Sequence, residues 1–235
     1  MPGLRIVAAT RYVTPLREGG SLPGLVEADD DGLYVLKFRG AGQGIKALVA
    51  EIVCGELARG LGLAVPEIVL MEVDPALGAA EPDPEIQDLI TGSAGVNVGL
   101  DFLPGSLPYT PAAGFQPTPE LAASVVWLDA LISNVDRTPR NPNLLVWHER
   151  LWLIDHGAAL IFHHRDWDPE VDAAKPFPGI ADHVLLPIAG PLPDLDVPDV
   201  LVRASVDAVP AEWADRDRYF DYLTRRLARP RGWAP

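Results

Sequence analysis

Three polar residues in the second half of the chain have the types and order expected of a metal and phosphate site. Asp136 is followed by Asn141 within the segment NVDRTPRNPN, and Asp155 comes after two apolar runs, LLVW and RLWLI. Carboxylate and amide oxygens are ligands that Mg²⁺ prefers, and magnesium bridges the phosphate oxygens of nucleotides. We therefore expect Asp136 to be the base or orienting group beside an incoming hydroxyl, and Asn141 and Asp155 to be metal ligands.

A second asparagine leaves the register of the amide ligand open. Asn143 follows Asn141 with only Pro142 between them, so either amide oxygen is a candidate. Aspartate and asparagine are also common in turns, and an isolated pair at this spacing would favour a turn. The interpretation as a site depends on further residues in the expected order.

A nucleotide site of this kind needs a cation for the α and β phosphates and a carboxylate that holds the cation in place. Lys37 lies in the strand-like stretch YVLKF, and Glu51 follows on a predicted helix. A helical wheel puts Glu51 at the edge of the apolar face of that helix and Glu56 near its centre. We expect Lys37 to contact the nucleotide and Glu51 to support it, with Glu56 as the alternative.

A backbone loop that covers the phosphates is expected upstream of this lysine. The glycine pair Gly19 and Gly20, followed by Ser21, lies where such a loop would be. Glycines permit a close approach of the backbone to a ligand, but two of them are also usual in a simple turn. Gly19, Gly20 and Ser21 are therefore candidate nucleotide-binding residues.

The first half of the chain contains the elements that must position Lys37 and Glu51. Its apolar, β-branched stretches predict a small sheet, and the turn signals around residues 19–20 and 29–32 separate the first strands. An apolar pattern at helical spacing over residues 44–62 predicts one helix that ends at glycines. The predicted strands are RIVAATRYVTPL, LPGLVEA, LYVLKFRG and PEIVLMEV. Residues 75–84 are expected to form a surface loop, and GLDFLPG is expected to connect two lobes.

The second half contains the elements that must position Asp136 and Asp155. Thr118 is suited to cap a helix, Pro119 fits its first turn, and the apolar residues that follow share one face. The runs LLVW and RLWLI predict a hairpin whose second strand ends at Asp155. Proline-rich turns are expected after residue 176, and a terminal helix over about residues 210–229.

The composition indicates a soluble globular protein and excludes several partners. Of the 235 residues, 48% are apolar and 22% are charged, which does not favour disorder. The formal net charge of −14 opposes general binding to nucleic acid. No stretch has the length of a membrane span, and the N-terminal residues lack the pattern of a signal peptide, so we expect a cytoplasmic protein. The single cysteine, Cys54, is expected to be a buried packing residue.

Other conspicuous polar residues have open interpretations. Arg137, next to the expected base, could contact phosphate, stabilise its loop or form a structural salt bridge. His163 and His164, with Asp166 nearby, could bind a metal, although adjacent histidines in a turn are usually solvated. These positions are not needed for the expected site.

Two segments carry a resemblance to a known family. The first is the predicted helix with the turn after it, at Glu51, Cys54, Leu57, Ala58, Gly62 and Pro66. The second is NVDRTPRN, around Asp136. Both resemble the HipA-like kinases, within the wider protein-kinase-like and phosphatidylinositol-kinase-like fold, and the similarity spans residues 12 to 160. At residues 155–157 this chain has AspHisGly, where AspPheGly is commoner among the kinases that it resembles.

The resemblance implies a fold and an activity. It implies an α+β, two-lobed protein-kinase-like fold, with a small β-rich N-lobe over residues 1–104, a mainly helical C-lobe over residues 105–235, and ATP between them. It implies an enzyme that transfers phosphate from ATP with magnesium to a protein serine or threonine hydroxyl, while lipid and small-molecule acceptors occur among relatives. The alternative is a pseudokinase that acts as a nucleotide-binding or partner-binding module.

Overall fold

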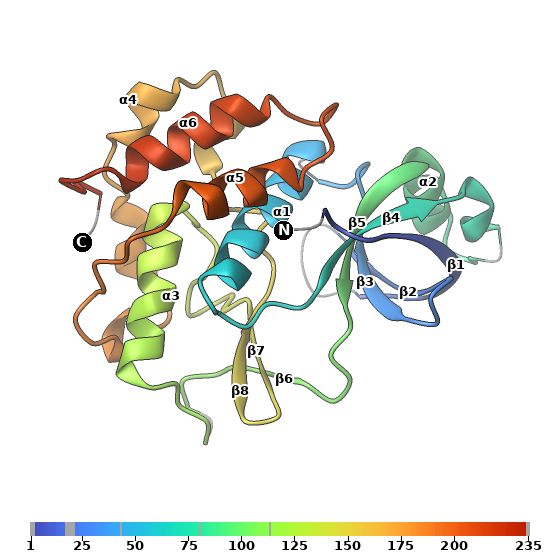
Figure 1. Cartoon of the computed structure of the whole chain (residues 1–235). Helices are drawn as coiled ribbons and strands as arrows, with labels where there is room; N and C mark the ends of the chain where they lie inside the picture. Colours follow the sequence, from blue (N-terminus) through green and yellow to red (C-terminus); the bar gives the residue numbers. More distant parts are fainter. Residues whose placement is uncertain (1–2, 17–21, 43, 80, 113, 234–235) are drawn as a thin grey trace. The chain divides into compact units, whose positions relative to one another are not determined.

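The computed structural model describes residues 3–16, 22–42, 44–79, 81–112 and 114–233 (Figure 1). The chain forms two compact units, one made of Met1–Leu48 and Pro66–Pro104 and the other of Val49–Val65 and Gly105–Pro235. The sequence prediction placed all of residues 1–104 in one lobe. Helix α1 (Ile45–Gly60) instead belongs mostly to the second unit.

The first unit contains a closed β-barrel, where the sequence predicted only a small sheet. The barrel order is β1-β2-β3-β5-β4, and β1 pairs with β4 in parallel to close it, whereas the other neighbours are antiparallel. Closure leaves no strand edge exposed. The strands are β1 (Ile6–Pro15), β2 (Gly24–Ala28), β3 (Leu33–Lys37), β4 (Ile68–Val73) and β5 (Gly95–Asp101).

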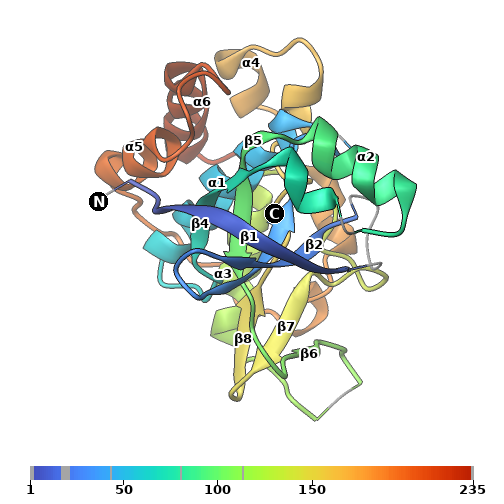
Figure 2. The same cartoon turned by 90° about the vertical axis from the view of Figure 1, so that its right-hand side faces the viewer.

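The barrel is filled by side chains that alternate along its strands. Val26, Leu36 and Met71 are fully buried inside it, as expected for strands with one face on a core. Two elements lie beside these strands within the segment between β4 and β5: the short 3-10 helix η1 (Pro75–Gly78) and helix α2 (Pro84–Gly92), which Figure 2 shows next to the barrel. The sequence prediction of a loop over residues 75–84 did not include α2.

Helix α2 begins where a local signal starts it. The side chain of Asp83 accepts a hydrogen bond from Glu85 N at 3.0 Å, and Pro84 occupies the first turn. Ile86 and Ile90 lie one turn apart and join the buried cluster of the barrel. A short amphipathic helix thus completes the core of the first unit.

Helix α1 is buried on almost all sides. Its residues from Leu48 to Cys54 are all buried, and Cys54 is a free, fully buried thiol, as predicted. Just beyond the helix, Ala64 O accepts a hydrogen bond from Leu153 N at 2.8 Å. A helix without a solvated face is a core helix, and this one packs with the rest of the second unit.

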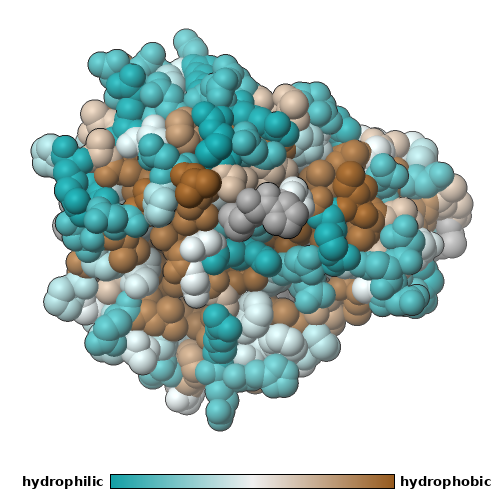
Figure 3. Space-filling view, in the orientation of Figure 1, coloured by the Kyte–Doolittle hydropathy of each residue, from teal (hydrophilic) through white to brown (hydrophobic). Residues whose placement is uncertain are grey.

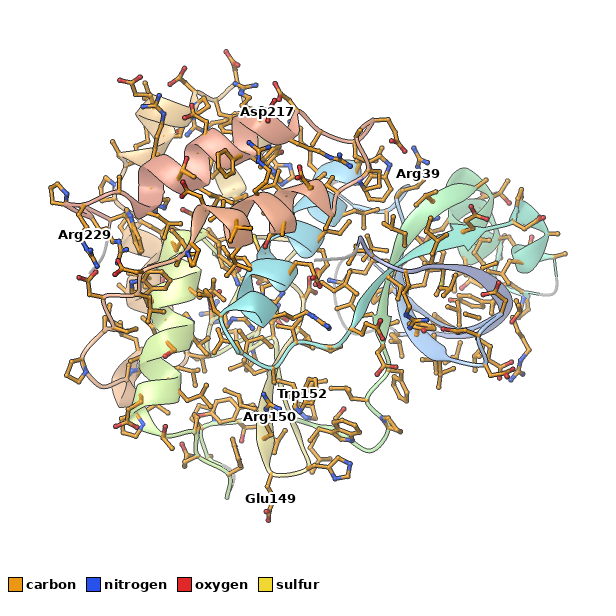
Figure 4. The ribbon with its side chains drawn as sticks, viewed as in Figure 1. Arg39, Glu149, Arg150, Trp152, Asp217 and Arg229 are labelled. Atoms are coloured by element: carbon orange, nitrogen blue, oxygen red, sulfur yellow. The ribbon has the colours of Figure 1, made fainter. Side chains whose placement is uncertain are left out.

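The second unit contains α3 (Pro119–Leu131) and a small three-stranded sheet. The side chain of Thr118 caps α3 by accepting from Leu121 N at 3.2 Å, which confirms the predicted start. The sheet has the order β6-β7-β8 and confirms the predicted hairpin. At its tip, Glu149 points away from the strands, and the Arg150 guanidinium lies 5.6 Å from the centre of the Trp152 ring (Figure 4). The strands are β6 (Leu107–Pro108), β7 (Leu144–Trp147) and β8 (Arg150–Leu153).

The rest of the second unit consists of short helices. Helix α6 (Arg216–Leu227) is shorter than the predicted terminal helix, and α5 (Asp199–Asp207) was not predicted. The surface over α4 and α6 is mostly hydrophilic (Figure 3). Within the described residues, no helix is both long and apolar enough to cross a membrane. The elements are η2 (Ile161–His164), α4 (Pro169–Ala173), η3 (Pro178–Asp182), η4 (Leu186–Ile188), α5 (Asp199–Asp207) and α6 (Arg216–Leu227).

One buried cation fastens these helices together. Arg226, on α6, is 1% exposed, and its guanidinium donates to Ala130 O and Leu131 O at the end of α3 and to Ala173 O at the end of α4. A positive charge is favourable near the carbonyl end of a helix. Arg226 thereby fixes the end of α3, from which the chain continues toward Asp136.

Candidate active site

The loop after α3 holds the carboxylate of Asp136 with two amide groups. Asn141 Nδ2 donates to Asp136 Oδ2 at 2.8 Å, and Asn143 Nδ2 donates to the same oxygen at 3.1 Å. An asparagine that turns its amide nitrogen to Asp136 turns its amide oxygen elsewhere. Both asparagines can therefore orient Asp136 and still present an oxygen to a cation, so the choice between them stays open.

Asp155 lies at the same end of the hairpin as Asn143. Leu144 pairs with Leu153 across β7 and β8, and one residue further on Ile154 N donates to Asn143 O at 3.1 Å. Asp155 follows directly, with a left-handed backbone at φ 55°, and Asn143 has φ 49°. Aspartate and asparagine adopt this conformation more readily than other non-glycine residues, and such backbone is concentrated at functional sites.

The donors at this end of the hairpin fit a hard divalent cation. They are the carboxylate of Asp155 and the amide oxygens of Asn141 and Asn143, all oxygen donors of the kind that magnesium prefers. Within the described part of the chain, three or more His, Cys, Asp or Glu side chains nowhere gather as a metal site. A cation here would therefore need further oxygens from water or from a phosphate, as is usual for magnesium in nucleotide sites.

The buried carboxylate of Asp129, on α3, anchors the loop that contains Asp136. Asp129 is fully buried, and its Oδ2 accepts from Arg137 Nε at 2.5 Å and lies 2.8 Å from His183 Nε2. Its Oδ1 accepts from Asn134 Nδ2 at 3.1 Å. Asn134 Oδ1 in turn accepts from Asp136 N at 3.1 Å. The side chain of Asn134 thus links the backbone at Asp136 to the buried network of Asp129.

The network keeps Asp129 ionised. Burial opposes ionisation of this carboxyl, but the charge of Arg137 and the hydrogen bond with His183 outweigh burial, so its pKa lies well below the usual range. A buried ion pair contributes to stability only when its remaining donors and acceptors are satisfied, and Asp129 has a partner at each oxygen.

Arg137 has the role of a structural cation. Its side chain is fully buried against Asp129, and it also donates through Nη1 to the carbonyl oxygens of Asn143 and Ile154. These two carbonyls lie on the two sides of the hairpin base. Of the interpretations left open by the sequence, the salt bridge and the stabilisation of the loop are both correct.

Two anchors of the loop, Asp129 and His183, were missed in the sequence. Asp129 had a detectable signal, because a charged residue inside the apolar stretch VVWLDALI is almost never fully buried without a partner. His183 lies in the segment where only proline-rich turns were expected. Nothing near it in the sequence connects it with Asp136.

Glu51 lies on α1 and faces the segment that begins at Asp155. Glu51 is fully buried, and its Oε1 is 3.6 Å from Nδ1 of His156, also fully buried. Glu56, the alternative, is paired with Arg59 at 3.3 Å, and its side chain is 14% exposed. The helical wheel ranked their burial wrongly, because α1 is buried on almost all sides rather than along one stripe.

The imidazole of His156 takes the place of the commoner phenylalanine ring. Within the described chain, neither of its ring nitrogens has a hydrogen-bond partner. It is therefore a buried polar ring whose Nδ1 lies 3.6 Å from the carboxylate of Glu51. This contact joins α1 to the residue that follows Asp155.

Lys37 is the last residue of β3 and belongs to the first unit, whereas Asp136, Asn141 and Asp155 belong to the second. The turn after it is fastened by neutral side chains. Asn97 Oδ1 accepts from Arg39 N at 2.7 Å, and Asn97 Nδ2 donates to two backbone carbonyl oxygens at 2.8 Å. The pairing of Lys37 with Glu51 stays a prediction.

The same turn contains glycines that the sequence prediction did not place in a turn. Gly40 N donates to Ser93 Oγ at 3.1 Å, and Gly42 and Gly44 have positive φ of 50° and 67°. Such glycines allow a tight turn directly before α1. The predicted phosphate loop at Gly19, Gly20 and Ser21 lies outside the described residues.

The histidine pair does not form a solvated turn. His163 is fully buried, with Nδ1 3.0 Å from Tyr219 Oη on α6 and Nε2 3.0 Å from Nε2 of His164. Burial raises the pKa of Tyr219 to about 12, so its hydroxyl keeps its proton at neutral pH. The pair therefore joins η2 to α6 through the hydroxyl of Tyr219.

A surface hollow in the second unit lies apart from these residues. Its volume is about 620 Å³, and none of the candidate residues lines it. Arg229 and Asp194, which line it, form an ion pair at 2.9 Å, so their charges are already compensated (Figure 4 labels Arg229). The chemistry of the loop and hairpin, not this hollow, marks the candidate active site. The lining residues are Trp127, Leu192, Pro193, Asp194, Arg229, Pro230 and Arg231.

Comparison with known proteins adds a family. Residues 10–170 match the family described as HipA-like kinase, which covers more than half of the chain. The match includes every candidate residue from Lys37 to Asp155. A comparison with curated protein sequences finds no match.

Solved structures give a similar fold. A proinflammatory kinase of Helicobacter pylori, CtkA, superimposes with a TM-score of 0.52 at 11% identity, over 96% of this chain and 94% of that chain. The Golgi casein kinase with Mn and ADP bound superimposes with a TM-score of 0.48 at 14% identity, over 99% of this chain and 75% of that chain. The first likeness shows a kinase fold in a mixed α/β chain.

Proposed function

Because this chain belongs to the HipA-like kinase family, we propose that it is an ATP- and magnesium-dependent phosphotransferase that acts on a protein serine or threonine hydroxyl. The observation that carries the proposal is that two asparagine amides hold the Asp136 carboxylate and that Asp155 follows the hairpin at the same end as Asn143. These are the groups that phosphoryl transfer requires of a protein. A cytoplasmic location stays a prediction.

The proposed role of Asp136 is to orient the acceptor and take its proton. The acceptor oxygen would attack the γ-phosphorus of ATP, the bond from that phosphorus to the oxygen shared with the β-phosphate would break, and the hydroxyl proton would pass to the Asp136 carboxylate. The amides of Asn141 and Asn143 limit the rotation of that carboxylate. A positioned base of this kind typically contributes about 10²–10⁴-fold to the rate.

The proposed role of Asp155 and Asn141, with Asn143 as the alternative to Asn141, is to hold magnesium. Bound magnesium would neutralise the negative charge that builds up on the phosphates. The protein would supply a carboxylate with fixed backbone and an amide oxygen on a fixed loop. Lys37 would contact the α and β phosphates and Glu51 would support it, within the two-lobed arrangement predicted from the sequence.

Calorimetric titration with ATP tests the nucleotide and metal parts of this proposal. We expect binding by the wild type that weakens strongly without magnesium and in Asp155→Asn, because the carboxylate ligand is lost. The matched control is Asp166→Asn, since the Asp166 side chain is fully exposed, and it should bind as the wild type does. A folded wild-type protein that does not bind ATP in magnesium would contradict the proposal. Binding without any phosphate transfer would instead favour the pseudokinase.

A further inference from the structure

His183 is a buried histidine that belongs to none of the sequence motifs, and its ring lies next to the anchor of the loop with Asp136. It follows η3, and its side chain is 2% exposed. We infer that His183 is a positioning residue for phosphate transfer, which holds the loop with Asp136 through Asp129 and Arg137. The inference rests on the proposed function.

The protonation of the His183 ring is fixed by its two neighbours. Leu185 N donates to His183 Nδ1 at 3.0 Å, so Nδ1 is the acceptor and carries no proton. Nε2 then carries the proton and donates it to Asp129 Oδ2 at 2.8 Å. The ring is therefore a directed link from a backbone amide to the buried carboxylate.

His183 and Arg137 share one oxygen of that carboxylate. Arg137 Nε donates to Asp129 Oδ2 at 2.5 Å, so the guanidinium and the imidazole bind Oδ2 from two elements. Arg137 immediately follows Asp136 in the chain. Any shift of Asp129 after the loss of one donor would therefore be passed to the residue beside the proposed base.

A second connection joins the same segment to the loop. Val184 N donates to Arg137 O at 3.0 Å, so the backbone after His183 fastens the backbone after Asp136. Asn134 completes the arrangement from the other side, since it donates to Asp129 Oδ1 and accepts from Asp136 N. The backbone is thus held both before and after Asp136, and the segment that contains His183 supplies the contact after it.

The contacts assign His183 to positioning rather than to catalysis. Its ring binds Asp129 and the amide of Leu185, and it acts on Asp136 only through other residues. Displacement of a reacting group by about 1 Å can cost about 10²-fold in rate. A residue that keeps Asp136 in place should therefore affect kcat much more than the KM for ATP.

Two amide substitutions separate the two hydrogen bonds of the ring. The amide nitrogen of His183→Gln can reach the position of Nε2 and keep the bond to Asp129. The amide oxygen of His183→Asn lies near the position of Nδ1, so this variant keeps the acceptor for Leu185 N and loses the donor to Asp129. Both variants remove the aromatic ring, so they form a matched pair.

Steady-state kinetics of phosphate transfer from ATP give the first result. We expect His183→Asn to lower kcat by about 10- to 100-fold, with the KM for ATP changed by less than about twofold. His183→Gln should retain most of the wild-type kcat. Equal kcat values in the two variants, after their melting temperatures are compared, would overturn the inference, because the bond to Asp129 would then not matter.

Amide hydrogen exchange keeps the inference testable if the wild type transfers no phosphate. A wild type that transfers no phosphate would contradict the proposed function. Whether His183 holds the loop with Asp136 could still be tested. In His183→Asn, but not in His183→Gln, the amides of Asp136 and Val184 should exchange faster while the strands of the barrel are unchanged. Unchanged exchange of both amides would overturn the inference.

Discussion

Two loops that adjoin proposed site residues, one in each unit, are fastened by different chemistry. The loop with Asp136 is anchored by a buried carboxylate, Asp129, with Arg137 as its cation. The turn after Lys37 is anchored by the amide of Asn97 and the hydroxyl of Ser93. Charged anchoring gives large energies when one partner is removed and depends on pH, whereas neutral anchoring gives smaller energies that do not. The region that would position the base thus depends on charge, and the turn beside Lys37 does not.

The largest effect is expected from Asp129→Asn. This change leaves the guanidinium of Arg137 buried without its carboxylate, so the free energy of unfolding should fall by about 3–5 kcal/mol. Chemical denaturation measures it, with Asp166→Asn as the exposed control. A loss below about 1 kcal/mol would mean that the buried pair is not an anchor, because that is the range of surface ion pairs.

A smaller effect is expected from Asn97→Ala in the first unit. The change leaves Arg39 N, Ser93 O and Gly95 O without the side chain that they bind. The bond to Ser93 O is buried and the other two are partly buried, so their loss should lower the free energy of unfolding by about 2 kcal/mol. Exchange of the Arg39 amide should become faster as well. If Asn97→Ala costs as much as Asp129→Asn, the contrast between neutral and charged anchoring fails.

The third test changes the pH instead of a residue. We expect it to give the smallest effect on stability near neutral pH and the sharpest contrast between the two loops in acid. The pKa of Asp129 is lowered in the folded state, so its contribution is complete above its unfolded pKa of about 3.8 and is lost as the pH falls below that value. Denaturation from pH 7 to pH 2 should show a shallower acid loss in Asp129→Asn than in the wild type. In Asn97→Ala, the free energy of unfolding should fall with pH in parallel to that of the wild type. A different pH dependence in this variant would contradict the comparison of the two loops.

Local patterns predicted the elements that carry the candidate residues. The capping threonine and Pro119 fix the start of α3, and the two apolar runs give the hairpin, whose second strand ends at Leu153, two residues before Asp155. The predicted helix over residues 44–62 became α1, Ile45–Gly60. These features depend on neighbours a few residues away, which a single sequence displays.

The features that the sequence did not predict depend on contacts between distant segments of the chain. The barrel closes because β1 pairs with β4, and neither strand carries a mark of that parallel pairing. His183 contributes to the loop only because the segment after η3 packs against α3. The burial of Glu51 likewise comes from contacts on almost all sides of α1, which a helical wheel does not contain.

The central claim is that Asp136 performs phosphate transfer from ATP. The most direct measurement follows the transfer of labelled γ-phosphate in magnesium, to the protein itself and to proteins of a lysate, by the wild type and by Asp136→Asn. Asparagine keeps the size of the side chain but cannot take the proton, so the account predicts transfer by the wild type and a loss of about 10²–10⁴-fold in the variant. Transfer at the same rate in the folded variant, or none by a wild type that binds ATP and magnesium, would contradict it.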